Sequence, residues 1–113
     1  MTYEVQSTGH ARLDLKNIYR YIADTLLEPV NAEKQYSRIE KAVYSLDSMP
    51  ERFRRYEKEP WRSRNLRIMP VDNYLVFYTV DNKNRIVTVT RIMYGARNID
   101  KELDNTFSEG FPT

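Results

Sequence analysis

Two segments in the C-terminal half of the chain are rich in β-branched and aromatic residues, and a short polar stretch separates them. The first segment covers residues 66–80 and the second residues 85–94, with Asp81-Asn82-Lys83-Asn84 between them. Strand-like segments joined by a polar turn predict a β-hairpin. The second segment closes with Tyr94-Gly95-Ala96-Arg97, so the predicted hairpin delivers Arg97 to a defined place just beyond a strand.

The two faces of the second predicted strand carry different side chains. Strict alternation puts Val87, Val89, Arg91 and Met93 on one face and Ile86, Thr88, Thr90, Ile92 and Tyr94 on the other. Neither face has the composition of a solvent-exposed surface. We therefore expect one face to pack on helices and the other to line a concave, partly polar surface, where Arg91 would lie near Arg97.

Apolar residues recur at helical spacing in two earlier segments. The first set is Ala11, Leu15, Ile18, Ile22 and Leu26, and the second is Ala32, Tyr36, Ile39, Val43 and Leu46. Glu28-Pro29 separates them, because proline fixes its own φ and disfavours helical angles in the preceding residue. So short a connection predicts two antiparallel helices, with the second beginning at about Val30 and ending before Pro50.

These elements together predict the fold class. Tyr3 and Val5 alternate with polar neighbours, which indicates a short first strand. We predict an α+β fold in which this N-terminal strand and an antiparallel helix hairpin pack on a small, mainly antiparallel twisted sheet. The 113 residues suit a single domain, 1–113. We expect a turn or short helix around residues 99–103 and a flexible tail at residues 104–113.

Composition narrows the classes of chemistry. The chain has no cysteine, which excludes disulfides, a thiolate nucleophile and cysteine-ligated zinc. A single histidine, His10, without an organised carboxylate cluster predicts neither a metal site nor a cofactor. No apolar run approaches the roughly 20 residues that span a bilayer, and no signal-peptide pattern opens the chain. We expect a cytoplasmic protein without a membrane partner.

Positive charge is concentrated between Glu51 and Arg67. This segment holds seven basic residues, Arg52, Arg54, Arg55, Lys58, Arg62, Arg64 and Arg67, against three acidic residues, with Phe53, Tyr56 and Trp61 among them. Guanidinium groups bind phosphates and aromatic rings stack on bases, so the segment suits a single-stranded RNA groove. It also suits a protein interface, or a solvated loop whose aromatic rings fold back onto the core. The candidates for binding a target or nucleic acid are Trp61, Arg62, Arg64 and Arg91.

Four segments in order resemble the RelE/ParE superfamily of toxins from type II toxin-antitoxin modules. They are residues 11–22, 39–50, 66–80 and 89–97, the last reading Val-Thr-Arg-Ile-Met-Tyr-Gly-Ala-Arg. The resemblance implies a growth-inhibiting toxin with a cognate antitoxin as its partner. The tail of that antitoxin would wrap the toxin and block its active surface. Operator DNA would be reached only indirectly, through the antitoxin.

The resemblance leaves two targets open. Members similar to RelE cut messenger RNA on the ribosome, whereas members similar to ParE poison DNA gyrase without nuclease activity. A RelE-like interpretation would make Arg67, Arg97 and Tyr94 the catalytic residues. However, Leu75 and Leu103 stand where a cutting toxin often has an arginine and a tyrosine, and His10 matches no catalytic position.

Elementary chemistry favours the ParE-like interpretation. Metal-free RNA cleavage needs a base for the 2′-hydroxyl, positive charge at the phosphorane and an acid for the leaving oxygen. An arginine, with a pKa above about 12, is a poor proton acceptor, and a tyrosine with a pKa of about 10 is a weak base at neutral pH. The pattern Arg-Ile-Met-Tyr-Gly-Ala-Arg at residues 91–97, followed by Asn98-Ile99-Asp100, also looks closer to ParE, and this resemblance implies inhibition of gyrase. A ribosome-dependent endoribonuclease and a non-toxic α/β interaction domain remain as alternatives.

Some of the candidate residues also have structural interpretations. Arg97 could form a salt bridge with Asp100 or Glu102, and Arg91 could pair with an acidic residue of a neighbouring strand. Tyr94 could be a half-buried aromatic residue of the sheet with its hydroxyl at the rim. Gly95 is expected to permit a bend or bulge that turns Arg97 inward.

Overall fold

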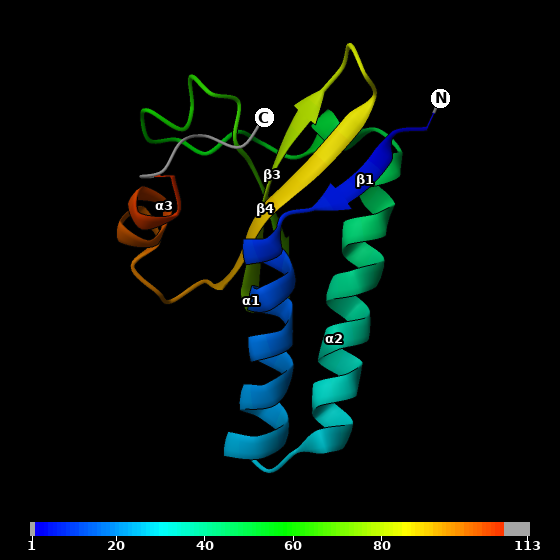
Figure 1. The fold of residues 1–113 in the computed structure, drawn as a ribbon, viewed down its shortest axis with the longest axis vertical. Coiled ribbons are helices and arrows are strands. Elements are labelled where there is room, and N and C mark those ends of the chain that lie inside the picture. The colour runs from blue at the N-terminus through cyan, green and yellow to red at the C-terminus, as the bar shows by residue number, and fades with distance from the viewer. Residues whose placement is uncertain (1, 108–113) are drawn as a thin grey trace.

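The computed structural model describes residues 2–107, which form a four-stranded sheet with helices on both sides (Figure 1). The strands are β1 (Glu4–Ser7), β2 (Arg67–Val71), β3 (Tyr74–Asp81) and β4 (Ile86–Tyr94). Their order across the sheet is β1-β4-β3-β2. β1 is parallel to β4, and the other two pairings are antiparallel. The predicted α+β class and the mainly antiparallel sheet are confirmed.

Two helices, α1 (Gly9–Arg20) and α2 (Pro29–Tyr44), lie side by side along one side of the sheet (Figure 1). Thr8 caps α1, because its hydroxyl accepts a hydrogen bond from the Ala11 N–H at 3.2 Å. After Arg20 the chain continues through a π-helical turn, Tyr21–Thr25. A short link then leads to Pro29 in the first turn of α2, the position at which proline costs a helix least. The predicted helix hairpin is therefore present.

The main core lies between the helix hairpin and the sheet. α1 and α2 contribute fully buried side chains such as Ala11 and Ile39, and the sheet contributes Val76, Tyr78 and Val89. Removing these apolar surfaces from water is the main favourable term for folding, at about 25 cal/mol per Å². The helical stripes predicted from periodicity supply this core.

A second apolar cluster covers the opposite face of the sheet. It consists of Trp61, Leu66, Ile68, Phe77, Met93 and Leu103. Phe77 alternates along β3 with Val76 and Tyr78 of the main core, so the two clusters lie on opposite faces. The segment before β2 and helix α3 (Ile99–Phe107) provide the covering residues. The expectation that this face is an open concave surface is therefore wrong.

A β-bulge in β4 changes which residues share a face. Phe77 is opposite Arg91, but the next residue of β3, Tyr78, is opposite Val89, so Thr90 is the extra residue. Its hydroxyl donates a hydrogen bond to the Phe77 carbonyl at 3.1 Å. Beyond the bulge the alternation inverts, and Ile92 packs with Val89 in the main core. The faces predicted from strict alternation are therefore wrong after Thr90.

The C-terminal segment contains a longer helix than expected. α3 extends from Ile99 to Phe107. The first four residues of the predicted tail, 104–107, are therefore helical. Residues 108–113 of that tail lie outside the described part of the chain. Among residues 2–107, no helix has both the length and the apolar character needed to cross a membrane.

Candidate functional site

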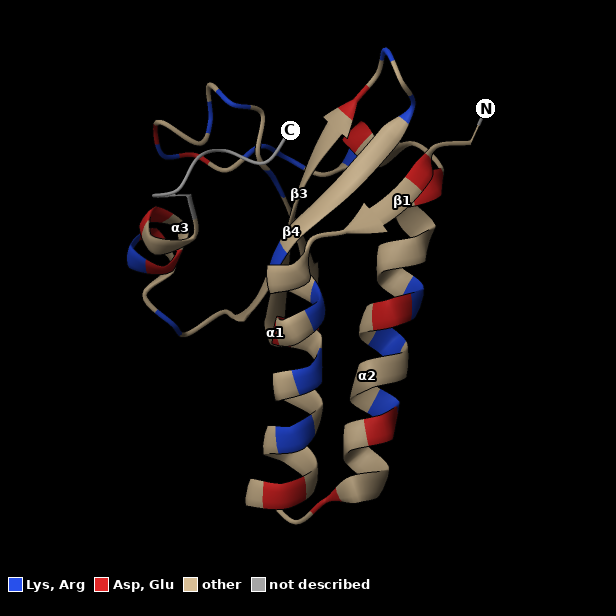
Figure 2. Cartoon of the chain, in the orientation of Figure 1, with Lys and Arg blue, Asp and Glu red and all other residues tan. Residues whose placement is uncertain are grey.

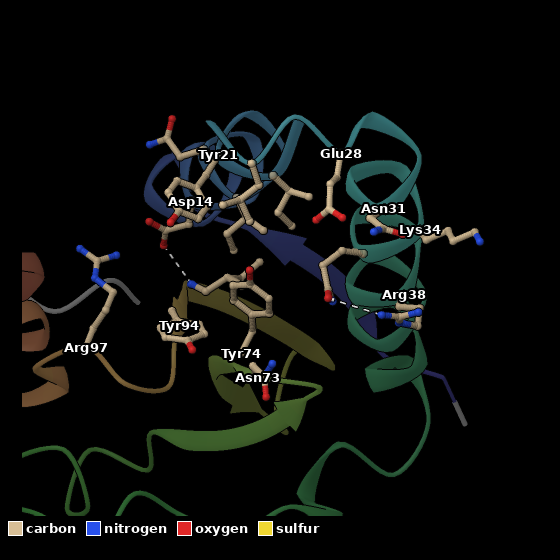
Figure 3. Close-up of a pocket in the computed structure, with 16 residues that line it drawn as sticks. Asp14, Tyr21, Glu28, Asn31, Lys34, Arg38, Asn73, Tyr74, Tyr94 and Arg97 are labelled. Carbon is tan, nitrogen blue, oxygen red and sulfur yellow. Dashed lines mark hydrogen bonds between the residues drawn. The ribbon is translucent and has the colours of Figure 1, made fainter. Parts of the chain in front are cut away.

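A groove of about 800 Å³ lies between the end of the helix hairpin at which α1 connects to α2, the β2–β3 turn and the end of β4 (Figure 3). Its apolar lining comes from Ile18, Tyr21, Ile22, Leu26, Tyr74, Ile92 and Tyr94. Its polar lining comes from Asp14, Asn17, Glu28, Asn31, Lys34, Gln35, Arg38, Asn73 and Arg97. The lining of the groove therefore combines apolar and aromatic side chains with charged and amide groups.

Two tyrosines form the wall of the groove on the sheet side. Tyr74 and Tyr94 are cross-strand partners on β3 and β4, and their rings meet edge to face with centroids 5.7 Å apart. Burial raises the pKa of the Tyr74 hydroxyl above its ordinary value. Tyr94 is about half exposed, so its ring belongs both to the sheet and to the groove.

The end of the helix hairpin exposes large apolar side chains. Tyr21 and Leu26 line the groove, and the neighbouring Leu27 and Val30 are more exposed still. Leu27 has a φ of 58°, which a bulky L-residue seldom adopts. An exposed apolar patch next to a groove is typical of a surface that another protein covers. The sequence-based prediction did not identify this patch, because Leu26 was assigned to the buried stripe of the first helix and the other three residues were assigned to no surface.

Arg91 is buried and is fully engaged, in part with Asp14 of the groove lining. Its Nε and Nη2 donate to the two carboxylate oxygens of Asp14 at 2.6 and 2.9 Å. Its remaining nitrogen donates to Thr106 and lies 3.7 Å from Glu102. The hydrogen bond to Asp14 holds the pKa of Arg91 above its usual value. The expectation that Arg91 binds a target is therefore corrected, because its charge is neutralised inside the fold.

Asp14 was not identified as a site residue from the sequence. It follows Ala11 by three residues and precedes Leu15 by one, so it falls on the buried face of α1. Its carboxylate also accepts a hydrogen bond from the Ile92 N–H at 2.9 Å. A carboxylate within an apolar helical stripe was the available signal, since such a group must find a cationic or N–H partner.

Arg97 lies at the mouth of the groove, near the position expected from the sequence (Figure 3). Its guanidinium is 3.0 Å from Glu102 on α3, and its side chain remains 45% exposed. Gly95 permits the close approach that brings the chain there. Its N–H donates to the Asn73 carbonyl at 2.9 Å, and a Cβ at this position would lie 3.3 Å from the same oxygen.

Arg67 lies far from Arg97. Arg67 is paired with Tyr78, whereas Tyr94 is paired with Tyr74, a separation of four residues along β3 or ~13 Å at ~3.3 Å per residue. The Arg67 guanidinium donates to the Phe53 carbonyl at 2.6 Å and pairs with Glu51 at 3.2 Å. It therefore fixes the segment before β2 rather than joining Arg97 in one site.

Trp61 is buried, with 4% of its surface exposed, in the second apolar cluster. Its ring is therefore not available to stack on a base, which corrects the expectation that it binds nucleic acid. The Arg64 guanidinium lies 5.7 Å above that ring. Arg62 and Arg64 are exposed, as a binding role would require. For Trp61, the interpretation in which the aromatic rings of the loop fold back onto the core is the one observed.

Tyr78 and His10 do not form an acid and base pair. The Tyr78 hydroxyl donates to the Pro50 carbonyl at 2.6 Å, and burial raises the pKa of Tyr78 to about 12. His10 is exposed in the first turn of α1 and does not line the groove. Within residues 2–107, no three His, Asp or Glu side chains are grouped closely enough to hold a metal ion.

The comparisons with known proteins agree on one superfamily. The model of the family described as the ParE toxin of type II toxin-antitoxin systems matches residues 5–99. The chromosomal ParDE system from P. aeruginosa includes a chain of similar fold, with a TM-score of 0.68 and 20% identity over 82% of this chain and 96% of that chain. No curated protein sequence matches.

Two further solved structures share the fold. The RelBE2 toxin-antitoxin complex from Mycobacterium tuberculosis gives a TM-score of 0.60 with 20% identity, over 86% of this chain and 95% of that chain. The RelE-RelB complex from Pyrococcus horikoshii gives 0.60 with 18% identity, over 86% and 99%. The structural likeness establishes the fold, and the family model covers most of the chain. The chain therefore belongs to the ParE toxin family of type II toxin-antitoxin systems.

Proposed function

We propose that this toxin inhibits growth by binding DNA gyrase and that a cognate antitoxin neutralises it by covering the groove. One observation carries the choice of gyrase over messenger RNA. Of the three residues that a RelE-like interpretation would make catalytic, Arg67 is committed to contacts that hold the fold together. Arg91 and the Tyr78 hydroxyl are committed in the same way, so neither can assist Arg97 and Tyr94. Such an action would place the toxin in the cytoplasm.

Cleavage of RNA requires a proton acceptor and a proton donor close to the cationic group. Arg97 is the candidate arginine that keeps substantial exposure, and Tyr94 lies in the same groove. An arginine supplies charge but does not accept a proton at neutral pH. Asp14 lines the groove too, but both its oxygens already accept hydrogen bonds from Arg91. Binding to a protein target requires none of these proton transfers.

The exposed apolar residues of the groove support an antitoxin as its occupant. The solved relatives of similar fold are described as complexes of a toxin with its antitoxin. Leu26 and Tyr21 stay about half exposed in the chain alone, and covering them would gain about 25 cal/mol for each Å² removed from water. An apolar segment of the antitoxin would fill the groove and lie against Tyr94 and Arg97.

A DNA supercoiling assay with purified gyrase tests the proposed target. We expect the toxin to reduce supercoiling and the toxin-antitoxin complex to have no effect. Undiminished gyrase activity at a large excess of the free toxin would exclude this target. Leu13→Asp is a suitable control variant, because Leu13 is exposed and lies outside the groove. We expect it to inhibit gyrase as the wild type does.

The ribosome-dependent alternative is tested separately, by primer extension on translating messenger RNA. New 5′ ends with the wild-type toxin, absent with Arg97→Ala, would establish an endoribonuclease and overturn the proposal. If induction leaves growth unchanged and neither assay responds, the chain is a non-toxic interaction domain. The half-exposed Arg97 in the groove is the observation that makes the second assay worthwhile.

A further inference from the structure

The loop between Phe53 and Leu66 carries a basic hollow that the groove and its proposed function do not use. The hollow has a volume of about 520 Å³ and is lined by Arg54, Arg55, Glu57 and Arg62. Figure 2 shows basic positions along this loop, which lies on the α3 side of the sheet and away from the end of the helix hairpin. We call Arg54, Arg55 and Arg62 the basic hollow.

The positive charge of the basic hollow is only weakly balanced by its surroundings. Arg54 is 3.2 Å from Glu57, but both side chains are largely exposed, and such pairs contribute little in water. Arg55 donates to the neutral amide of Asn65 at 3.2 Å, which leaves its charge in place. These guanidinium groups can therefore exchange their present contacts for an anionic ligand.

Besides Glu57, the loop carries a second acidic residue, Glu59, whose charge interacts with Arg62. It accepts hydrogen bonds from the backbone N–H and the hydroxyl of Ser63, and these bonds hold its pKa below the usual value. Its oxygens are therefore oriented by Ser63. The charge of Glu59 also attracts Arg62 and Arg55. With Glu57 and Glu59, two carboxylates face the three guanidinium groups, so the net charge of this surface stays positive.

The chemistry around the hollow selects among polyanions. Between residues 53 and 66 no large apolar side chain is among the exposed ones, so the loop lacks the apolar anchor on which a protein interface depends. Trp61 is buried, and the Tyr56 hydroxyl donates to Asp100 at 2.6 Å. These rings offer no stacking platform for unpaired bases. What remains is guanidinium chemistry, which binds phosphate oxygens.

We infer that the basic hollow binds the backbone phosphates of duplex nucleic acid without reading its sequence. A duplex presents a continuous row of phosphates while its bases stay stacked, which matches a surface with cations and no exposed ring. This contact is independent of the proposed action on gyrase. Sequence-specific recognition of an operator would still come from the antitoxin.

Fluorescence anisotropy with a short labelled DNA duplex tests this inference on the full toxin chain. The logarithm of the association constant should fall linearly with the logarithm of the salt concentration. The slope should be about −3 if each of the three arginines contacts one phosphate. The variant R54Q/R55Q/R62Q should bind about tenfold or more weaker and lose most of that slope. Circular dichroism of each variant confirms that it is folded.

A matched variant controls for total charge. K16Q/R20Q/K41Q removes three exposed cations from the helix hairpin, outside the basic hollow. We expect this variant to keep the affinity and the salt dependence of the wild type. Equal losses in the two triple variants would overturn the inference, because binding would then depend on net charge alone.

Competing ligands separate the possible partners. Polyglutamate and a duplex RNA of the same length serve as competitors for the labelled DNA. Polyglutamate that competes as well as DNA would overturn the inference in favour of an acidic protein. Competition by either unlabelled duplex supports the inference, and the tighter of the two identifies which duplex the basic hollow takes. If gyrase is unaffected while DNA binding by the basic hollow is seen, the proposed target fails and this inference stands.

Discussion

Arg91 on β4 and Asp14 on α1 form a bidentate ion pair whose two side chains are only 10% and 11% exposed. The two residues are far apart in sequence, and the pair joins the first helix to the last strand. Through Glu102 and Thr106 the same guanidinium also reaches α3. Elements on both sides of the sheet are therefore connected through one arginine.

Breaking this pair should be costly. Asp14→Ala leaves the buried Arg91 without its bidentate partner and with only the longer 3.7 Å contact to Glu102, and we expect a loss of about 3 kcal/mol in the free energy of unfolding. Arg38→Ala is the matched control, because its pair with Asp72 is exposed and should cost no more than about 1 kcal/mol. Urea denaturation of both variants measures the difference. Equal small losses would show that Arg91 is solvated when Asp14 is absent.

Stability should fall in alkali, and Tyr78 should contribute to this fall. Its pKa is raised to about 12 in the fold by burial, against about 10 when unfolded. The protonated hydroxyl is therefore favoured by folding. Its contribution is complete below pH ~10 and is lost as the pH rises toward ~12. Tyr78→Phe should flatten this part of the stability curve and cost about 1 kcal/mol at neutral pH through the lost bond to Pro50. An unchanged alkaline slope in the variant would contradict this assignment.

Replacing Gly95 or Gly9 by alanine should change the stability of the fold in opposite directions. At Gly95 a Cβ would lie 3.3 Å from the Asn73 carbonyl oxygen, so Gly95→Ala must shift the β2–β3 turn. We expect a loss of about 1 kcal/mol. At Gly9, in the first turn of α1, the nearest atom is the flexible end of Arg12 at 3.9 Å. Gly9→Ala should stabilise by up to about 1 kcal/mol. Thermal unfolding of both variants tests the contrast.

Antitoxin binding should depend on the groove and not on exposed apolar surface in general. Leu26, which is 47% exposed, lines the groove, whereas Leu13, which is 55% exposed, does not. Leu26→Asp should weaken binding of the cognate antitoxin about tenfold or more, and Leu13→Asp should leave it unchanged. The antitoxin can be sought as a short reading frame adjoining this one. Calorimetry that finds equal effects would place the antitoxin elsewhere.

Arg97 should matter more for toxicity than for stability. Its contact with Glu102 is half exposed, so Arg97→Ala should cost less than about 1 kcal/mol in unfolding free energy. We expect the same variant to lose most of its growth inhibition, because Arg97 stands at the mouth of the groove. Lys101→Ala, which removes an exposed cation from α3, is the control. Full toxicity of Arg97→Ala would remove this residue from the active surface.

Periodicity predicted the helix hairpin because apolar residues such as Leu15 and Ile39 follow the helical repeat with little interruption. Proline at position 29 then fixed where the second helix begins. The hairpin of β3 and β4 was equally readable from its β-branched residues and polar turn. The position of Arg97 just beyond β4 followed from the hairpin alone.

The amino-acid sequence by itself determined the elements, their order and the family resemblance, because these depend on local spacing. Only the tertiary structure decided which side chains are available. The bulge at Thr90 inverts the faces of β4, and no local pattern marks it. Trp61 and Arg91 are of the residue types that often bind partners. In this fold, however, Trp61 is buried in the second apolar cluster and Arg91 pairs with Asp14. Burial and ion pairing are set by contacts between distant segments, so they appear only once the sheet is covered on both faces.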